Sequence, residues 1–371
     1  MRLILSITAS VAFSAHVFAQ NTEALFKKIV DSTYNAHPEM IGLIVDVESP
    51  DHKISWSYAV GKNGKDNQQP IDPAQPLLIA STTKPYMAAA ILRLVENGKL
   101  SIDTPIKNLL SAKTLKVLSD DGYDVEKINL RHLLSHTAGI NDYVTENYFS
   151  FINTHKTYNW TRDEQIALAG KEKKVGEPGT VFRYADINYV LISEIIEQKT
   201  GKPFYEALRS LLNYKKLGIK STWFIQLEKK PESSLPLVNQ YWRQFDWQIK
   251  DLNPSWDLYG GGGIASNVKE MAQFFQMLFN GKIIKNPKVL QLMYTDVPPN
   301  LEINYCLGIR KIKSGGMMAY NHGGGLGTDA IYIPEINASI SSASVEAGKR
   351  NVAVEVSSLL AAKLKSLKAS K

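Results

Sequence analysis

Ser81 and Lys84 are the residues whose types and spacing first indicate chemistry. They lie three positions apart in the stretch LLIASTTKPYM, residues 77–87. Side chains at positions i and i+3 of a helix share a face, so the amine can reach the hydroxyl. A serine becomes a nucleophile when a base removes its proton, and a lysine can be that base where burial or a nearby cation makes its neutral form accessible. The pair is a candidate nucleophile with its base.

The same stretch also has a purely structural interpretation. Serine is a favoured helix N-cap, and Pro85 is tolerated in the first turn, where backbone N–H groups have no acceptor within the helix. If Ser81 is the cap, Lys84 falls at the third helical position, where its charge faces the positive end of the helix dipole. The cap interpretation therefore explains the serine but not the lysine.

A second Ser-x-x-Lys shows why this spacing alone decides little. It joins Ser266 to Lys269, directly after a run of four glycines at 260–263. Asn267 and Glu270 have the spacing of a capping box there, before a run with helical periodicity. A helix start is a sufficient explanation of this second pair.

Two further stretches offer groups that would complete a site around Ser81. FRYADINYVLISEIIE, residues 182–197, places Tyr184 just before a helical pattern, and YNHGGGLGTDAIYIPE, residues 320–335, contains a glycine-rich strand end. Glycines allow the backbone to approach a ligand closely. Each stretch is a weak signal by itself, because a loop tyrosine is usually a packing residue and His-Gly-Gly is usually a turn.

Taken in order, these motifs resemble those of the serine β-lactamase and penicillin-binding protein superfamily, in its class C-like branch. The branch has Ser-x-x-Lys, Tyr-x-Asn and Lys/His-x-Gly. Four other phrases are similar to this branch: GKLSIDTPI, INLRHLLSHTAGINDY, INYVLISEIIEQKTG and GGGGIASNVKEMAQF. The resemblance covers nearly the whole chain beyond its first twenty residues. The matching residues here are Ser81-Thr82-Thr83-Lys84, Tyr184-Ala185-Asp186 and His322-Gly323-Gly324.

The resemblance implies an exported serine hydrolase that is acylated on Ser81, most similar to D-alanyl-D-alanine carboxypeptidases. Lys84 and Tyr184 would share proton transfer to and from the serine oxygen. The backbone N–H groups of Ser81 and Gly325 would form the oxyanion hole, on the edge strand that also bears His322.

The residues expected to bind substrate depart from the usual pattern. They are Asp186, His322, Gly323 and Gly324. Asp186 stands where asparagine is common, so it would hold Lys84 charged more strongly and favour Tyr184 as the general base. His322 replaces a lysine, so recognition of a substrate carboxylate is expected to be weaker or more dependent on pH.

The implied fold is α+β: a mainly antiparallel sheet flanked by helices and packed against an all-α domain. Hydrophobic periodicity agrees, because strand and helix patterns at both ends surround a helical middle. We expect a sheet domain from residues 20–85 and 255–371 and a mainly helical domain from 86–254. Strands are predicted at 40–49, 53–61, 305–312, 317–323, 329–335 and 338–346, and helices at 21–37, 128–136, 162–170, 187–201, 203–212, about 267–280 and 351–367.

Composition and the first residues limit the classes of protein to which this sequence can belong. The 371 residues, 44% of them hydrophobic, can bury a large core, and the single cysteine, Cys306, excludes an internal disulfide. Residues 1–19 have Arg2, an apolar run and a small residue at Ala19, which is typical of a cleaved signal peptide and predicts a periplasmic or secreted protein without a stable membrane anchor. The net charge of +7 comes from scattered lysines, without a pattern typical of nucleic-acid binding.

Three other kinds of site are disfavoured. His132 and His136 are four apart, but the glutamate of a metalloprotease helix and further ligands are missing. The glycines at 260–263 are not followed by Gly-Lys-Ser/Thr, so a tight buried connection is expected rather than a phosphate loop. No Gly-x-Ser-x-Gly occurs. We therefore expect no metal and no cofactor.

The substrate remains open at this level. A small molecule or peptide is expected: a D-Ala-D-Ala peptide, a β-lactam or an ester. The alternative to a carboxypeptidase is an esterase or weak class C-like β-lactamase on the same scaffold. A further alternative is a non-catalytic sensor or binding module that keeps the fold.

Overall fold

The computed structural model describes residues 21–297 and 304–367. The predicted signal peptide therefore lies outside the described residues. Within these ranges, no helix is both long and apolar enough to cross a membrane.

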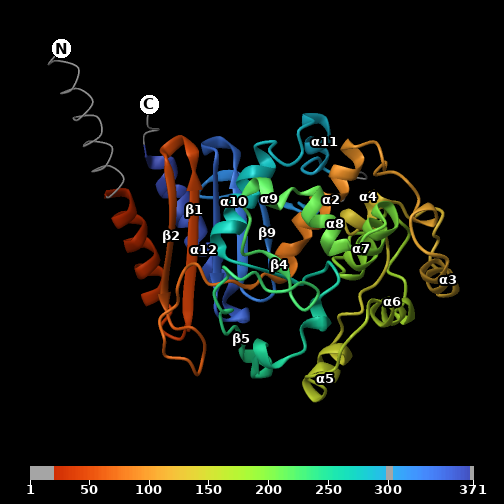
Figure 1. Cartoon of the computed structure of the whole chain (residues 1–371), viewed down its shortest axis with the longest axis horizontal. Coiled ribbons are helices and arrows are strands. Elements are labelled where there is room, and N and C mark those ends of the chain that lie inside the picture. Colours follow the sequence, from red (N-terminus) through yellow and green to blue (C-terminus); the bar gives the residue numbers. More distant parts are fainter. Residues whose placement is uncertain (1–20, 298–303, 368–371) are drawn as a thin grey trace, which may run out of the picture.

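A six-stranded antiparallel sheet forms one side of the molecule (Figure 1). Its strand order is β2-β1-β11-β10-β9-β8. The two ends of the chain meet in it, because β1 pairs with β11 and sets Val45 opposite Ser342. The strands are β1 (Gly42–Ser49), β2 (Ile54–Gly61), β8 (Arg310–Ser314), β9 (Met317–Gly323), β10 (Thr328–Ile333) and β11 (Ala338–Ser344).

Alternation of side chains along β1 shows how the sheet is covered on both faces. Leu43, Val45 and Val47 pack into one core with a helix over residues 21–35 and with α12 (Arg350–Ser366). Ile44 faces the opposite side and joins the main core, where α10 (Val268–Phe279) covers β1, β10 and β11. The period of two in a strand thus produces a layered helix–sheet–helix arrangement.

The helical part lies beside the sheet (Figure 1). Its centre is α7 (Ile187–Thr200). This helix packs against α2 (Lys84–Glu96), α4 (Leu130–Leu134), α6 (Arg162–Lys171) and α8 (Phe204–Leu211). The other helices are α3 (Ala112–Asp120), α5 (Glu146–Thr154), α9 (Tyr214–Leu217) and α11 (Pro287–Leu292). Short strands form two small sheets, β3 (Leu77–Leu78) with β7 (Ile264–Ser266) and β4 (Trp223–Phe224), and β5 (Tyr241–Trp242) with β6 (Trp247–Gln248).

This architecture confirms the predicted α+β fold with an antiparallel sheet flanked by helices. The strand predicted at 305–312 begins five residues late, at Arg310. The reason is a tight turn, in which the Cys306 N–H donates to the Ile309 carbonyl and Gly308 has a left-handed φ of 75°.

The helix start predicted after the second Ser-x-x-Lys is confirmed, but its capping box is not. The Asn267 side chain accepts from the Glu270 N–H at 2.8 Å, so Asn267 is the N-cap of α10. The Glu270 carboxylate instead accepts from the backbone of Lys220 and Ser221. A tertiary contact has therefore replaced the local one.

Candidate active site

Ser81 lies in a short 3₁₀ turn, η2 (Ala80–Thr83), between β3 and α2. Ala80 has a left-handed φ of 45°, a conformation that costs free energy for a residue with a Cβ. The interpretation of Ser81 as the helix cap is wrong, because Thr83 is the N-cap of α2 and no side chain caps it. The 3₁₀ turn takes the place of a capped start and frees the Ser81 hydroxyl.

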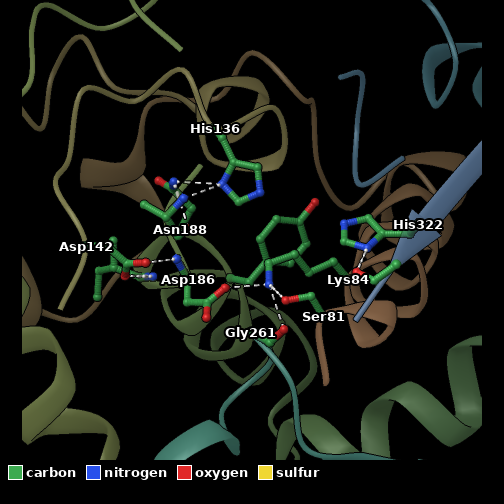
Figure 2. Close-up of polar contacts among 12 residues, drawn as sticks. Ser81, Lys84, His136, Asp142, Asp186, Asn188, Gly261 and His322 are labelled. Carbon is green, nitrogen blue, oxygen red and sulfur yellow. Dashed lines mark hydrogen bonds and ion pairs between the residues drawn. The ribbon is translucent and has the colours of Figure 1, made fainter. Parts of the chain in front are cut away.

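Lys84 is fully buried at the first residue of α2. Its Nζ donates to Ser81 Oγ at 2.9 Å, to Asp186 Oδ1 at 2.5 Å and to the Gly261 carbonyl at 2.7 Å (Figure 2). An ammonium has three protons to donate, and these three oxygens accept all of them. The geometry fits a charged lysine.

The charge of Lys84 follows from the balance of burial and attraction. Burial alone would lower the pKa of Lys84, but the Asp186 carboxylate and Tyr184 outweigh it and raise the pKa above its usual range. The ion pair expected from Asp186 in place of asparagine is thus present in the structure.

Tyr184 lies beside this ion pair, in the segment that leads into α7. The Lys84 Nζ is 4.9 Å from the centroid of the Tyr184 ring. Burial raises the pKa of Tyr184, and it outweighs the opposing effect of the Lys84 charge. The phenol is therefore neutral at neutral pH.

Asp142 fixes the backbone at the start of α7. Its two carboxylate oxygens accept from the Asp186 N–H at 2.9 Å and the Ile187 N–H at 3.3 Å (Figure 2). A carboxylate at a helix N-terminus satisfies free donors and complements the helix dipole. Asp142 thereby determines where Asp186 stands relative to Lys84.

The four glycines at 260–263 form the tight connection that the sequence predicts. A Cβ on Gly261 would lie 3.1 Å from Asp186 Cγ, and a Cβ on Gly262 would lie 2.2 Å from Asp257 Oδ2. The glycines are needed because two carboxylates pack directly against their backbone. The Gly261 carbonyl can therefore reach Lys84.

His322 lies on β9 next to the Ser81 turn, but its imidazole is fully buried. Nε2 is 3.0 Å from the Tyr305 hydroxyl, and Nδ1 is 3.0 Å from the Gly323 carbonyl oxygen. Burial, with the charges of Arg310 and Lys84, holds the pKa of His322 well below its usual range. Both ring nitrogens are occupied, so neither is free for a substrate carboxylate.

The strand that bears His322 is not the edge of the sheet, because β8 lies outside β9. The expectation of an edge strand is wrong for β9 as a whole. However, β8 begins at Arg310 opposite Asn321, so His322 and Gly323 extend past its end. These two residues therefore have no partner in β8.

The glycines after His322 have different surroundings. A Cβ on Gly323 would lie 2.2 Å from Arg350 Nε, and a Cβ on Gly324 would lie 2.2 Å from the Ile79 carbonyl oxygen. Gly325 is itself exposed in the turn before β10, and a Cβ there would meet nothing within 4 Å. Gly323 and Gly324 allow close packing, whereas Gly325 leaves its backbone accessible.

Arg310 is a site residue that the sequence analysis missed. Its guanidinium lies 5.5 Å from the ring centroids of both Tyr184 and Tyr305. In residues 21–297 and 304–367, no carboxylate forms an ion pair with it. The only sequence signal is a cation at the start of the strand next to His322, which is too common to indicate a site.

Asp142 and Asp257 were also missed, because their approach to Lys84 depends on tertiary packing. Burial is the main cause that raises the pKa of Asp142 to about 7 and that of Asp257 to about 8, and the Asp186 charge adds to it. With Asp186, these carboxylates give the Lys84 side of the site an acidic character.

The two histidines considered as a zinc pair have separate partners. His132 Nδ1 accepts from the Asn129 N–H in the capping box of α4. His136 lies 3.2 Å from the Tyr305 hydroxyl. Across the described part of the chain, no three His, Cys, Asp or Glu side chains gather as a metal site would require.

Comparison with known proteins identifies the family of this site. A family model described as "Beta-lactamase" matches residues 34–354, most of the chain. The chain belongs to the beta-lactamase family. The resemblance seen in the three motifs is thereby confirmed at the level of the family.

Curated proteins with different names are similar to this chain. An N-acetylmuramyl-L-alanine amidase of Bacillus subtilis (strain 168) is 26% identical over 301 residues, 71% of this chain and 66% of the relative. Penicillin-binding protein 4* of the same organism is 24% identical over 193 residues, 52% of this chain and 39% of the relative. The chain thus spans less than two thirds of these relatives.

A solved structure shows the same fold over almost its whole length. The D-amino acid amidase from Ochrobactrum anthropi SV3, complexed with L-phenylalanine amide, superposes with a TM-score of 0.76 and 22% identity. The match covers 93% of this chain and 99% of the amidase.

Proposed function

We propose that this protein is a D-alanyl-D-alanine carboxypeptidase that acts through an acyl-enzyme on Ser81. The observation that carries the proposal is the contact of 2.9 Å between Lys84 Nζ and Ser81 Oγ, beside the Asp186 carboxylate and the Tyr184 ring. It joins a hydroxyl to a fixed cation, which stabilises the negative charge that develops on the attacking oxygen.

The protonation states indicate how the proton moves. Lys84 is an ammonium and Tyr184 a neutral phenol, so neither is a free base at rest. As Ser81 Oγ bonds to the carbonyl carbon and the C–N bond breaks, the serine proton passes to the Tyr184 oxygen while the phenol's own proton passes to the leaving nitrogen. Tyr184 is therefore a neutral phenol before and after this relay. Water then reverses these steps and releases the acyl product.

The oxyanion would be held by backbone N–H groups of Ser81 and Gly325. Gly325 is exposed in a turn outside any strand, and its N–H makes no backbone hydrogen bond in the described ranges. The neighbouring Gly324 packs against Ile79, two residues before Ser81. A free N–H beside this contact is a group that could stabilise a tetrahedral intermediate.

Arg310 supports a substrate that ends in a carboxylate. It is a cation without an ion-pair partner in the described ranges, and it lies against the Tyr184 ring. A guanidinium binds a carboxylate with two parallel hydrogen bonds. The buried, neutral His322 cannot provide this charge, so Arg310 takes the place of the missing lysine.

The relatives support chemistry at an amide next to a D-amino acid. One is a penicillin-binding protein, and one solved structure is a D-amino acid amidase. We carry this substrate class to the present chain as part of the proposal.

The test compares a D-Ala-D-Ala peptide, a short-chain nitrophenyl ester and a fluorescent penicillin. We expect release of D-Ala from the peptide and a long-lived penicillin adduct on Ser81. Arg310→Gln should lower kcat/KM for the peptide at least 10-fold and leave the neutral ester within about 2-fold. Arg131→Gln, which removes an arginine from a surface ion pair with Asp103, is the matched control.

Other outcomes would overturn the proposal in distinct ways. Ester cleavage without D-Ala release would indicate an esterase, and rapid penicillin turnover would indicate a β-lactamase. A folded protein that is inert towards all three compounds would indicate a binding module.

A further inference from the structure

A buried chain of hydrogen bonds runs beneath Tyr184 and has no part in the steps above. His136 Nε2 lies 3.2 Å from the Tyr305 hydroxyl oxygen, and this oxygen lies 3.0 Å from His322 Nε2. His136, Tyr305 and His322 are each at most 1% exposed. Polar groups this deeply buried destabilise the folded state unless they are paired. The fold therefore depends on these hydrogen bonds being made.

The partners at both ends fix the direction of every bond. At one end, His136 Nδ1 accepts from the Ala185 N–H at 3.3 Å and the Asn188 amide at 3.1 Å. At the other end, His322 Nδ1 must donate, because its partner at 3.0 Å is the Gly323 carbonyl oxygen. A neutral imidazole has one donor and one acceptor nitrogen.

The tautomers follow from these two ends. His136 carries its proton on Nε2 and donates to the Tyr305 oxygen. The Tyr305 hydroxyl then donates to His322 Nε2, and His322 carries its proton on Nδ1. The assignments from the two ends agree at Tyr305, so the chain is satisfied throughout.

The hydrogen-bond chain connects the two halves of the active site. Ala185 stands between Tyr184 and Asp186, just before α7, and Gly323 ends β9 on the sheet side. The His136 ring also packs against the Tyr184 ring, with centroids 4.3 Å apart. His136 has a left-handed φ of 58°, so the backbone is strained where this ring is placed.

Burial, together with the surrounding charges, keeps both imidazoles neutral. The charged and titratable side chains that face them are Lys84 from α2, Arg310 from β8, Tyr184 before α7 and Tyr189 on α7. Burial, with the two cations, holds the pKa of both histidines well below the usual range.

We propose that His136 and Tyr305 are positioning residues, which hold the Tyr184–Asp186 segment and the His322–Gly323 strand end in register through one directional hydrogen-bond chain. The proposal rests on the proposed acyl-enzyme function, because that function requires proton transfer at Tyr184 and the Gly325 turn to act on the same carbonyl group. Neither residue contacts the substrate.

Tyr305→Phe tests this by removing the central oxygen and little else. The expected result is a loss of 10-fold or more in kcat at nearly constant KM. Tyr214→Phe is the matched control, since Tyr214 is also buried and its hydroxyl has no hydrogen-bond partner in the described ranges. A Tyr305→Phe enzyme with unchanged kcat would overturn the proposal.

A second measurement tests the hydrogen-bond chain even if the Tyr305→Phe variant does not fold or the enzyme acts on a substrate other than the proposed peptide. Nitrogen-15 NMR of the wild-type protein should show His136 protonated on Nε2, His322 protonated on Nδ1 and no titration of either between pH 5 and 8. In Tyr305→Phe, both imidazole signals should shift. Opposite tautomers, or titration in this range in the wild type, would contradict the chain itself rather than the catalytic function.

Discussion

Asp186 determines the chemistry of Lys84 more than any other single residue. A buried lysine without a counter-charge becomes neutral, because the interior penalises the ammonium. Here the carboxylate at 2.5 Å reverses that tendency. The aspartate in place of the usual asparagine thus makes the lysine a fixed cation, and in the proposed mechanism proton transfer falls to Tyr184.

The Asp186→Asn substitution should expose this dependence. Without the negative charge, the pKa of Lys84 falls, so the ammonium is lost at lower pH. The alkaline limb of the kcat/KM profile should therefore move down by one pH unit or more, as measured by initial rates from pH 6 to 11. Asp251→Asn, at an exposed residue, is the control. An alkaline limb that stays in place or moves up would rule out a cationic Lys84 as the catalytic form.

At the residue scale, the sequence predicted the motif residues but not their immediate partners. The positions of Ser81, Lys84, Tyr184 and Asp186 follow from ordered motifs. Arg310 and Asp257 come near the site only through packing of distant segments, and no local pattern marks them.

At the scale of elements, the Ser81 turn is held against the β9–β10 turn by a few polar contacts. Thr328 Oγ1 donates to the Ile79 carbonyl at 2.9 Å and lies 2.9 Å from Thr82 Oγ1. The backbone of Gly324 is in direct contact with Ile79. These contacts set the distance between the nucleophile and the Gly325 N–H.

The Gly324→Ala substitution should separate these two turns. Its Cβ would lie 2.2 Å from the Ile79 carbonyl oxygen, so one segment must move. We expect a loss of stability of about 1–3 kcal/mol, as for other overpacked sites, and a fall in kcat/KM of at least 10-fold. Chemical denaturation and initial rates measure the two effects.

Gly348→Ala provides the control for this experiment. A Cβ on Gly348 would meet nothing within 4 Å. This variant should keep its stability and activity. Equal effects of the two substitutions would show that the contact of Gly324 with Ile79 does not control the site.

Periodicity predicted the strands and long helices well, because burial on one face or both repeats along each element. It failed at ends decided by tertiary contacts. Ser81 is not a cap because the preceding backbone turns into a left-handed conformation at Ala80. Glu270 does not close a capping box because the backbone of residues 220 and 221 binds it instead.

At the scale of the whole molecule, the acidic residues around Lys84 link the helical part to the glycine run at 260–263. Asp142 precedes α5, Asp186 precedes α7, and Asp257 packs on Gly262. Three carboxylates around one ammonium leave an excess of negative charge. Burial raises the pKa of Asp142 to about 7 and of Asp257 to about 8, so the folded protein retains protons there.

This charge excess predicts how stability depends on pH. Above the ordinary aspartate pKa of about 4, the folded state binds more protons at these residues than the unfolded state does. Their contribution to the free energy of unfolding therefore decreases as the pH rises from about 4 to about 8, and is constant above that range. Calorimetry should give a lower Tm at pH 8.5 than at pH 6.

The Asp257→Asn variant isolates this contribution. It removes one of the groups that titrate, so the fall in Tm between pH 6 and pH 8.5 should become smaller. Asp251→Asn should retain the wild-type dependence. A variant at Asp257 with an undiminished fall in Tm would show that other groups cause the pH dependence.

Intact-protein mass spectrometry after a rapid acid quench tests whether Ser81 is the nucleophile. With a D-Ala-D-Ala peptide or a penicillin, we expect a mass increase of one acyl group, mapped by proteolysis to the peptide that contains Ser81. The adduct and the activity should both be absent from a folded Ser81→Ala protein. An adduct on another residue, or substrate turnover by Ser81→Ala at the wild-type rate, would contradict this role of Ser81.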